Sequence, residues 1–176
     1  MIIKDIEVIN QPISGCFEER VYDIQSAYKS LEWTWLKFTN DDYSEWCGEF
    51  RGRYIAHAIS KKYESILVLT SDWLHQLSIH DGTIQYYEDS PQYRNLTVTP
   101  MGQYIASDYY CISILGETIN DVQYLETPLK LDMIDFKTWE GFKLKITGDE
   151  FMNWDNQVEL ELDCRTMCIE IKKQNK

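Results

Sequence analysis

Apolar and polar residues alternate along QVELELDCRTMCIEIKK, residues 157–173. Val158, Leu160 and Leu162 fall on one side, and the acids between them fall on the other. Because successive side chains of a strand point to opposite faces, this pattern predicts a strand with one buried face and one wet face. A turn around residues 163–166 leads into a second alternating run, so the whole stretch predicts a β-hairpin.

Further stretches have strand character. HQLSIHDGTIQYYE, residues 75–88, contains Asp81-Gly82, a pair that tolerates positive φ and marks a two-residue hairpin turn. SILVLTS, residues 65–71, is continuously apolar and predicts a central strand that is covered on both faces. NLTVTPMGQYIASDYYCISIL, residues 95–115, predicts another pair of strands around its Pro-Met-Gly turn.

Helical periodicity is scarce. ERVYDIQSAYKSLEW, residues 19–33, alternates poorly for a strand, and its apolar positions are equally compatible with one short helix. No low-complexity linker divides the chain. We therefore expect a single β-rich domain over residues 1–176, an antiparallel β-sandwich or a bent two-layer sheet with at most one short helix.

A faint internal repeat supports an alternative fold. LTSDWLHQL and IASDYYCIS, residues 69–77 and 105–113, share an apolar run, Ser-Asp, an aromatic residue and a second apolar run. Strand, tight Asp turn and strand at intervals of about 30–45 residues is typical of propeller blades. Because this length allows four blades at most, the lower limit for propellers, the alternative is a small propeller-like repeat.

The chain is strongly acidic, with 29 Asp and Glu against 17 Lys and Arg and a formal net charge of −12. A surface that grips nucleic-acid phosphates needs clustered Lys and Arg. The one local basic cluster, between residues 51 and 62, is surrounded by acids. We therefore expect no direct nucleic-acid binding, whereas an acidic surface attracts basic partners at long range.

Cysteine count and hydropathy bear on the compartment. Five cysteines are an odd number, which argues against a complete disulfide framework and predicts reduced thiols in a cytoplasmic protein. The first fifteen residues carry acids inside their apolar run, so they do not read as a signal peptide. No stretch approaches the roughly 18 apolar residues of a membrane span, and no membrane partner is expected.

Signatures of catalysis are missing from the sequence. His57, His75 and His80 are not spaced as metal ligands, because residues five apart on a strand lie on opposite faces. The chain has no G-x-S-x-G elbow and no glycine-rich phosphate loop. The two Ser-Asp pairs are typical of turns, in which the carboxylate accepts hydrogen bonds from nearby backbone N–H groups. We expect no catalytic residue, no metal site, no cofactor and no enzymatic activity.

Aromatic residues are abundant, with six Trp, twelve Tyr and six Phe. These residues favour strands and are also enriched at protein interfaces. Trp33, Trp35, Trp46 and Trp73 could stack on sugars, so a carbohydrate- or protein-binding β module without catalysis is the alternative function.

In EWTWLKFTNDDYSEW, residues 32–46, aromatic residues alternate with acids. With its size, charge and composition, the chain resembles the immunity proteins of bacterial polymorphic toxins, including contact-dependent growth inhibition systems. The resemblance implies a cytosolic protein that binds a cognate toxin domain, often a basic nuclease, and blocks its active site or substrate entry. An acidic inhibitor can take the place of a phosphate backbone there, and its field speeds association.

Two stretches join acids to aromatic residues in expected loops, where recognition residues concentrate. We predict that they contact the partner, with buried aromatic anchors that limit dissociation. The 41–46 patch consists of Asp41, Asp42, Glu45 and Trp46, and the 86–89 patch consists of Tyr86, Tyr87, Glu88 and Asp89.

Overall fold

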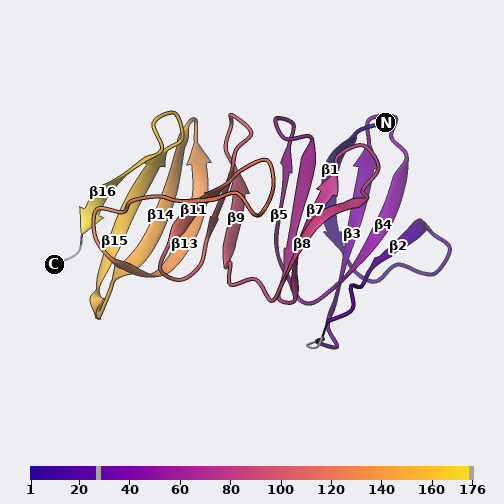
Figure 1. Ribbon diagram of the computed structural model, residues 1–176, viewed down its shortest axis with the longest axis horizontal. Coiled ribbons are helices and arrows are strands. Elements are labelled where there is room, and N and C mark those ends of the chain that lie inside the picture. The colour runs from indigo at the N-terminus through magenta and orange to yellow at the C-terminus, as the bar shows by residue number, and fades with distance from the viewer. Residues whose placement is uncertain (27–28, 175–176) are drawn as a thin grey trace. The chain divides into compact units, whose positions relative to one another are not determined.

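The protein is all-β. The computed structural model describes residues 1–26 and 29–174, and these residues form sixteen strands and no helix (Figure 1). Contacts divide the chain into two compact units, a first unit of Met1–Pro91 and a second unit of Gln92–Lys176. Each unit contains two four-stranded sheets. The single domain expected over residues 1–176 stays a prediction.

The first unit begins with an unusual sheet, whose strand order is β1-β3-β4-β2. Its strands are β1 (Ile3–Ile9), β2 (Glu18–Tyr22), β3 (Trp33–Asn40) and β4 (Glu45–Arg51). Strand β2 pairs in parallel with β4, whereas the other pairs of this sheet are antiparallel. The second sheet is an antiparallel meander of β5 (Tyr54–Ser60), β6 (Ser65–Thr70), β7 (Trp73–Ser78) and β8 (Ile84–Asp89).

The second unit repeats the meander twice. One sheet consists of β9 (Asn95–Val98), β10 (Tyr104–Ser107), β11 (Ile112–Leu115) and β12 (Val122–Tyr124). The other consists of β13 (Leu131–Glu140), β14 (Lys143–Glu150), β15 (Asn153–Asp163) and β16 (Cys168–Gln174). All pairs in both sheets are antiparallel, and the register of β13 against β14 shifts between Asp132 and Asp135.

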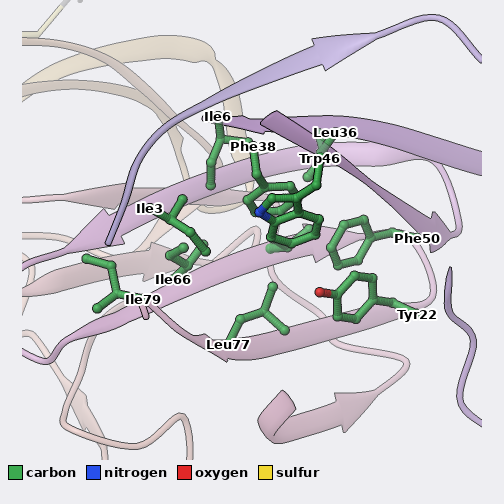
Figure 2. Close-up of a cluster of buried hydrophobic side chains, with 11 residues drawn as sticks. Ile3, Ile6, Tyr22, Leu36, Phe38, Trp46, Phe50, Ile66, Leu77 and Ile79 are labelled. Carbon is green, nitrogen blue, oxygen red and sulfur yellow. The ribbon is translucent and has the colours of Figure 1, made fainter. Parts of the chain in front are cut away.

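The core of the first unit is rich in aromatic rings (Figure 2). Phe38 stacks on Trp46 with ring centroids 4.0 Å apart, and Tyr22 stacks on Phe50 at 4.3 Å. Gly48 makes this packing possible, because a Cβ at that position would lie 2.7 Å from the Phe50 ring. Stacked ring pairs add to the free energy gained from burial alone.

The buried core cluster of the second unit is aliphatic. It is made of Ile105, Ile112, Ile114, Leu131, Ile134, Leu144, Ile146, Val158, Leu160, Leu162 and Ile169. Several of these come from inward positions of β14, β15 and β16, which confirms the predicted inward side of Val158, Leu160 and Leu162. The alternation is incomplete, because Glu161 is also buried and Ile171 is 37% exposed. The paired strands β15 and β16 confirm the predicted hairpin.

The second sheet confirms one predicted strand and corrects one predicted turn. Strand β6 is buried at every residue and lies between β5 and β7, as predicted for a central strand. The β7–β8 hairpin exists, but its connection runs from residue 79 to 83 and is not a two-residue turn. Gly82 takes a φ of 71°, and the Asp81 carboxylate closes the longer turn by accepting hydrogen bonds from Thr83.

The short helix proposed within residues 19–33 is absent from the described part of this stretch, and residues 27–28 lie outside the described residues. Its first residues instead belong to β2, where pairing with β4 and the stack of Tyr22 on Phe50 favour an extended backbone. Four separate four-stranded sheets match the propeller-like alternative better than one sandwich.

Candidate partner-binding surfaces

The acids of the 41–46 patch hold the β3–β4 hairpin. Asp41 accepts a hydrogen bond from the backbone N–H of Ile2 at 3.0 Å. Asp42 accepts bonds from the N–H of Ser44 at 3.0 Å and from its hydroxyl at 2.6 Å, and these bonds lower the pKa of Asp42. Glu45 lies 3.4 Å from the ammonium of Lys37. All three carboxylates therefore form hydrogen bonds or ion pairs within the free protein.

Trp46 does not belong to the surface. It is 3% exposed, because its ring stacks on Phe38 in the core and lies against the Gly82 backbone of the β7–β8 turn. Trp46 was predicted in a loop as an anchor for the partner, but it lies in β4 and is buried. The exposed aromatic residue nearby is Tyr43, which is 78% exposed and has the Lys4 ammonium 3.5 Å from its ring centroid.

The 86–89 patch lies on a strand and not in the predicted loop, with Tyr86, Tyr87 and Asp89 exposed, and its contact with a partner stays a prediction. Strand β8 forms an edge of its sheet. Tyr86 is 41% exposed and Tyr87 is 54% exposed, with the Tyr87 ring meeting the buried Trp73 edge-on. Glu88 is half-buried, which raises its pKa, and Asp89 accepts hydrogen bonds from Ser26 and Ser90.

An aromatic cleft lies on the first sheet. Half-buried Trp33 and Trp35 and the side chain of Tyr54 line a volume of about 380 Å³. The polar residues of its lining are Asn10, Gln11, Glu32, Thr34 and Arg53. The Arg51 guanidinium covers the Trp33 ring at 4.2 Å and pairs with Asp23. Its hydrogen bonds to that carboxylate lower the pKa of Asp23. Since Trp46 and Trp73 are buried, only two of the four tryptophans proposed for sugar stacking are accessible.

Sequence reasoning missed a group of exposed apolar side chains in the second unit, the turn cluster, defined as Tyr110, Met133, Phe151 and Met152. They are between 43% and 79% exposed. The Tyr110 and Phe151 rings meet edge-on with centroids 6.2 Å apart. The tyrosine pair after Asp108 was a visible signal, but Met133 comes from the bulge of β13, and Phe151 and Met152 come from the β14–β15 turn.

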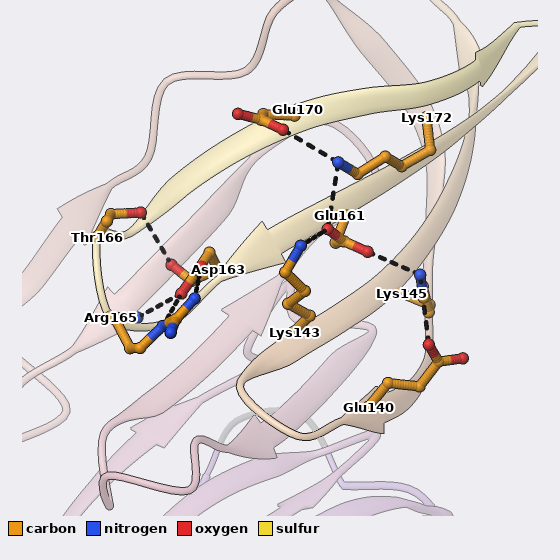
Figure 3. A network of polar contacts seen from close by, with 9 residues as sticks. All are labelled: Glu140, Lys143, Lys145, Glu161, Asp163, Arg165, Thr166, Glu170 and Lys172. Atoms are coloured by element: carbon orange, nitrogen blue, oxygen red, sulfur yellow. Dashed lines mark hydrogen bonds and ion pairs between the residues drawn. The ribbon is translucent and has the colours of Figure 1, made fainter.

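A charged ladder covers one face of the last sheet (Figure 3). The Glu161 carboxylate pairs with Lys143 at 2.6 Å, with Lys145 at 2.7 Å and with Lys172 at 3.3 Å. The three lysines lower the pKa of Glu161 to about 2. Because the acid and the bases compensate one another, this face offers less charge to a partner than its composition suggests.

His57 and His75 contact aromatic side chains inside the first unit. Tyr54 and His57 share a hydrogen bond at 2.9 Å, and burial lowers the pKa of His57. His75 is buried among Tyr22, Phe50 and Trp73, which lowers its pKa to about 4.

Within residues 1–26 and 29–174, no group of three or more His, Cys, Asp or Glu side chains is placed to hold a metal ion. The five cysteines are free thiols. In the same described part of the chain, no helix could span a membrane.

No protein-family model and no curated protein sequence matches the chain. Similar solved structures include Hsv2 from Kluyvelomyces marxianus, at 8% identity and a TM-score of 0.41, with 81% of this chain and 52% of that chain covered. They also include the WD40 domain of SCAP from fission yeast, at 8% identity and a TM-score of 0.41, with 99% and 49% covered. The chain spans about half the length of these structures, and this similarity does not assign it to a family.

Proposed function

We propose that the chain is a non-catalytic protein-binding β module, built from four propeller-like four-stranded sheets. The observation that carries the proposal is the edge strand β8, on which Tyr86 and Tyr87 are exposed beside Glu88 and Asp89. Exposed tyrosines supply apolar contact area with a polar tip, and an edge strand can pair with an extended segment of a partner. The acids next to them favour a basic partner.

A narrower form of the proposal is toxin immunity in the cytoplasm of a bacterium. The partner would be a cognate toxin domain, such as a basic nuclease, whose active site or substrate entry the acidic module covers. The net charge of −12 supports this form, because opposite charge speeds association and the effect weakens with salt.

The experiment that tests the proposal measures binding to the dominant basic partner captured at low salt. We expect the double variant Tyr86→Ser/Tyr87→Ser to lose about tenfold or more in affinity, since exposed tyrosines that become buried are frequent hot spots. Tyr124→Ser is the matched control, because Tyr124 is a 68%-exposed tyrosine on the edge strand β12. Equal losses in both variants, or no loss in the double variant, would remove β8 from the interface.

A carbohydrate-binding module is the second candidate function, and the cleft of Trp33, Trp35 and Tyr54 favours it. Flat indole faces can stack on the apolar face of a sugar ring, while the amide and charged groups of the lining can bond its hydroxyls. Glycan binding should change tryptophan fluorescence with little dependence on salt. Loss of that change in Trp35→Ala, with no effect of the β8 double variant, would favour this candidate.

A further inference from the structure

The short length of β1 leaves one side of Trp33 without a neighbouring strand. Strand β3 begins at Trp33, but the last pair between β1 and β3 joins Ile9 to Trp35. On the other side, β4 continues to Arg51, which lies opposite Trp33 and covers one face of its ring. The β1 side of Trp33 is therefore open, and the aromatic cleft lies there, because its lining includes residues 8–11 from the end of β1.

Two indole rings share the outer face of β3. Burial alternates along this strand, so Trp33 and Trp35 are half-buried on one face, while Thr34 and Leu36 are buried on the other. Side chains two residues apart on a strand are separated by about 7 Å. Among the described residues, neither indole N–H has a hydrogen-bond acceptor. Flat apolar rings with unpaired N–H groups suit a ligand that combines an apolar face with hydroxyl groups.

Polar side chains without partners border these rings. Asn10, Gln11, Glu32 and Arg53 belong to the lining and are exposed. Within the described part of the chain, none of these four side chains forms a hydrogen bond or an ion pair. Amides donate and accept, a carboxylate accepts and a guanidinium donates. Hydroxyl groups also donate and accept, so a polyhydroxylated ligand can pair with all four side chains.

The far wall of the cleft is held in place by hydrogen bonds. The N–H of Arg53 donates to the hydroxyl of Ser71 at 2.9 Å, and its carbonyl accepts from the N–H of Ser71 at 2.8 Å. The hydroxyl of Tyr54 shares a hydrogen bond with Nδ1 of His57 at 2.9 Å, which orients the Tyr54 ring. A site that is formed before the ligand arrives loses less entropy on binding.

Charges in the cleft balance one another. Among the described residues of its lining, the charged ones are one acid, Glu32, and one base, Arg53. Arg51, which covers the Trp33 ring, is neutralised by two hydrogen bonds to Asp23 at 2.7 and 2.8 Å. An ionic ligand would be attracted by one charge of the lining, repelled by the other and partly dehydrated, whereas an uncharged ligand avoids the cost of ionic dehydration.

Size and hydrogen bonding favour a sugar over a proline-rich peptide segment. The cleft measures about 380 Å³, near the lower end of the roughly 300–1,000 Å³ of small-molecule sites. Proline rings also stack on tryptophan, but a proline-rich segment has carbonyl acceptors and few N–H donors. The carboxylate of Glu32 would then stay unpaired, whereas sugar hydroxyls can donate to it.

We propose that the aromatic cleft binds an uncharged disaccharide unit whose hydroxyl groups are mainly equatorial. In such a sugar the axial C–H groups form an apolar face on each ring, and these faces would contact Trp33 and Trp35. The hydroxyl groups would bond the four polar side chains of the lining. The inference rests on the second candidate function, carbohydrate binding, and narrows the class of its ligand.

The test follows the indole N–H signals of the ¹⁵N-labelled full chain at pH 6 while cellobiose, xylobiose or N,N′-diacetylchitobiose is added. We expect at least one of these sugars to shift the signals of Trp33 and Trp35. Trp46 and Trp73 are internal controls, because they are 3% and 1% exposed. Cellobiouronic acid, which is anionic, and deacetylated chitobiose, which is cationic, should each bind about fivefold more weakly than the best neutral sugar or weaker still.

Variants connect the binding to the cleft. Gln11→Ala should weaken the best neutral sugar about threefold or more, because it removes a side chain that bonds hydroxyl groups. Gln11→Lys should make cellobiouronic acid bind more tightly than cellobiose, because it gives the lining a net positive charge. Gln85→Ala and Gln85→Lys are the matched controls, since Gln85 is an exposed glutamine of the first unit outside the lining. Equal effects at positions 11 and 85 would place the sugar elsewhere and overturn the inference.

The outcomes separate this inference from the functions on which it depends. If an ionic sugar shifts Trp33 and Trp35 at least as strongly as the neutral sugars, the inference is wrong and carbohydrate binding stands. If no sugar shifts them, the inference and the carbohydrate candidate both fail, while protein binding through β8 still depends on the Tyr86 and Tyr87 variants. If deca-proline shifts both indoles and no sugar does, the cleft takes a peptide segment, which overturns the inference and supports a protein-binding module.

Discussion

The buried core clusters of the two units differ in their aromatic content. In the first unit, Tyr22, Phe38, Trp46 and Phe50 stack inside the core. In the second unit, the buried cluster is Ile, Leu and Val, whereas Tyr110 and Phe151 are exposed on turns. The difference shows that a high aromatic content marks neither a core nor an interface by itself. What decides is whether the residue lies at an inward strand position, which Tyr86 and Tyr87 on β8 do not occupy.

The largest expected effect separates a buried ring from an exposed one. Trp46→Ala should lower the free energy of unfolding of the first unit by about 3–5 kcal/mol, because it leaves a cavity beside Phe38 and the Gly82 backbone. Phe151→Ala should change the stability of the second unit by less than about 0.5 kcal/mol, because the ring is 43% exposed on a turn. Urea denaturation followed by amide hydrogen exchange in each unit measures both values.

A small effect of Trp46→Ala would contradict the aromatic-core description. If Phe151→Ala lowered the free energy of unfolding by several kcal/mol, the Phe151 ring would be part of the core of the second unit and not an exposed side chain. In that case the exposed rings of the second unit would stabilise the fold.

Alternation predicted the structure at residues 157–173, but the same pattern around Trp46 was interpreted as a loop. The alternation in residues 157–173 predicted a hairpin correctly, because a one-residue slip would place every apolar side chain in water. The same period places Trp46, Gly48 and Phe50 on one face of β4. The acids next to Trp46 are typical of a loop, although the alternation is typical of a strand. Acids next to an aromatic residue in the sequence do not indicate whether its ring points into the core or into solvent.

Other features depend on tertiary structure. The parallel pairing of β2 with β4 joins segments separated by the whole of β3, and no local pattern specifies it. The turn cluster combines residues near positions 110, 133 and 151 of the chain, which come together when β13 bulges and packs beside the β10–β11 turn. The 86–89 patch could be proposed from the sequence because its tyrosines and acids occur within one segment, and its contact with a partner stays a prediction.

The second prediction concerns acid sensitivity of the aromatic core. Burial lowers the pKa of His75 to about 4 from an ordinary 6.5, so below pH 6.5 protons bind the unfolded chain more readily than the folded one. Stability of the first unit should fall by about 3 kcal/mol as the pH falls from 6.5 to 4.

The variant His75→Leu should lose much of this pH dependence, although its free energy of unfolding at pH 7 will differ from that of the wild type. The measurement is the free energy of unfolding at half-unit steps of pH in both proteins. An equal slope for wild type and variant would show that His75 titrates normally, and would place it in a more polar site than the contacts with Tyr22, Phe50 and Trp73 provide.

The third and smallest expected effect concerns the second unit, which should respond to acid in a lower range. The pairs with Lys143, Lys145 and Lys172 lower the pKa of Glu161 to about 2 from an ordinary 4.5. A carboxyl whose folded pKa is depressed stabilises the protein above its unfolded pKa, and that contribution disappears as the pH falls from 4.5 toward 2. Glu161→Gln should therefore be less stable than the wild type at pH 7, and the gap should close across this window.

Hydrogen exchange in β15, followed at pH values from 7 to 2, checks this prediction. Glu159→Gln is the matched control, since Glu159 lies two residues away on the same strand and pairs at 3.7 Å with Lys173 alone among the ion pairs of the described residues. The stability difference between Glu159→Gln and the wild type should be much smaller at pH 7 and should disappear over the same pH range. If both variants behave alike, the lysines around Glu161 act as ordinary exposed pairs, which contribute little. If instead the Glu161→Gln gap closes between pH 6.5 and 4, the acid response of the second unit would coincide with that of His75, and pH could not distinguish the two units.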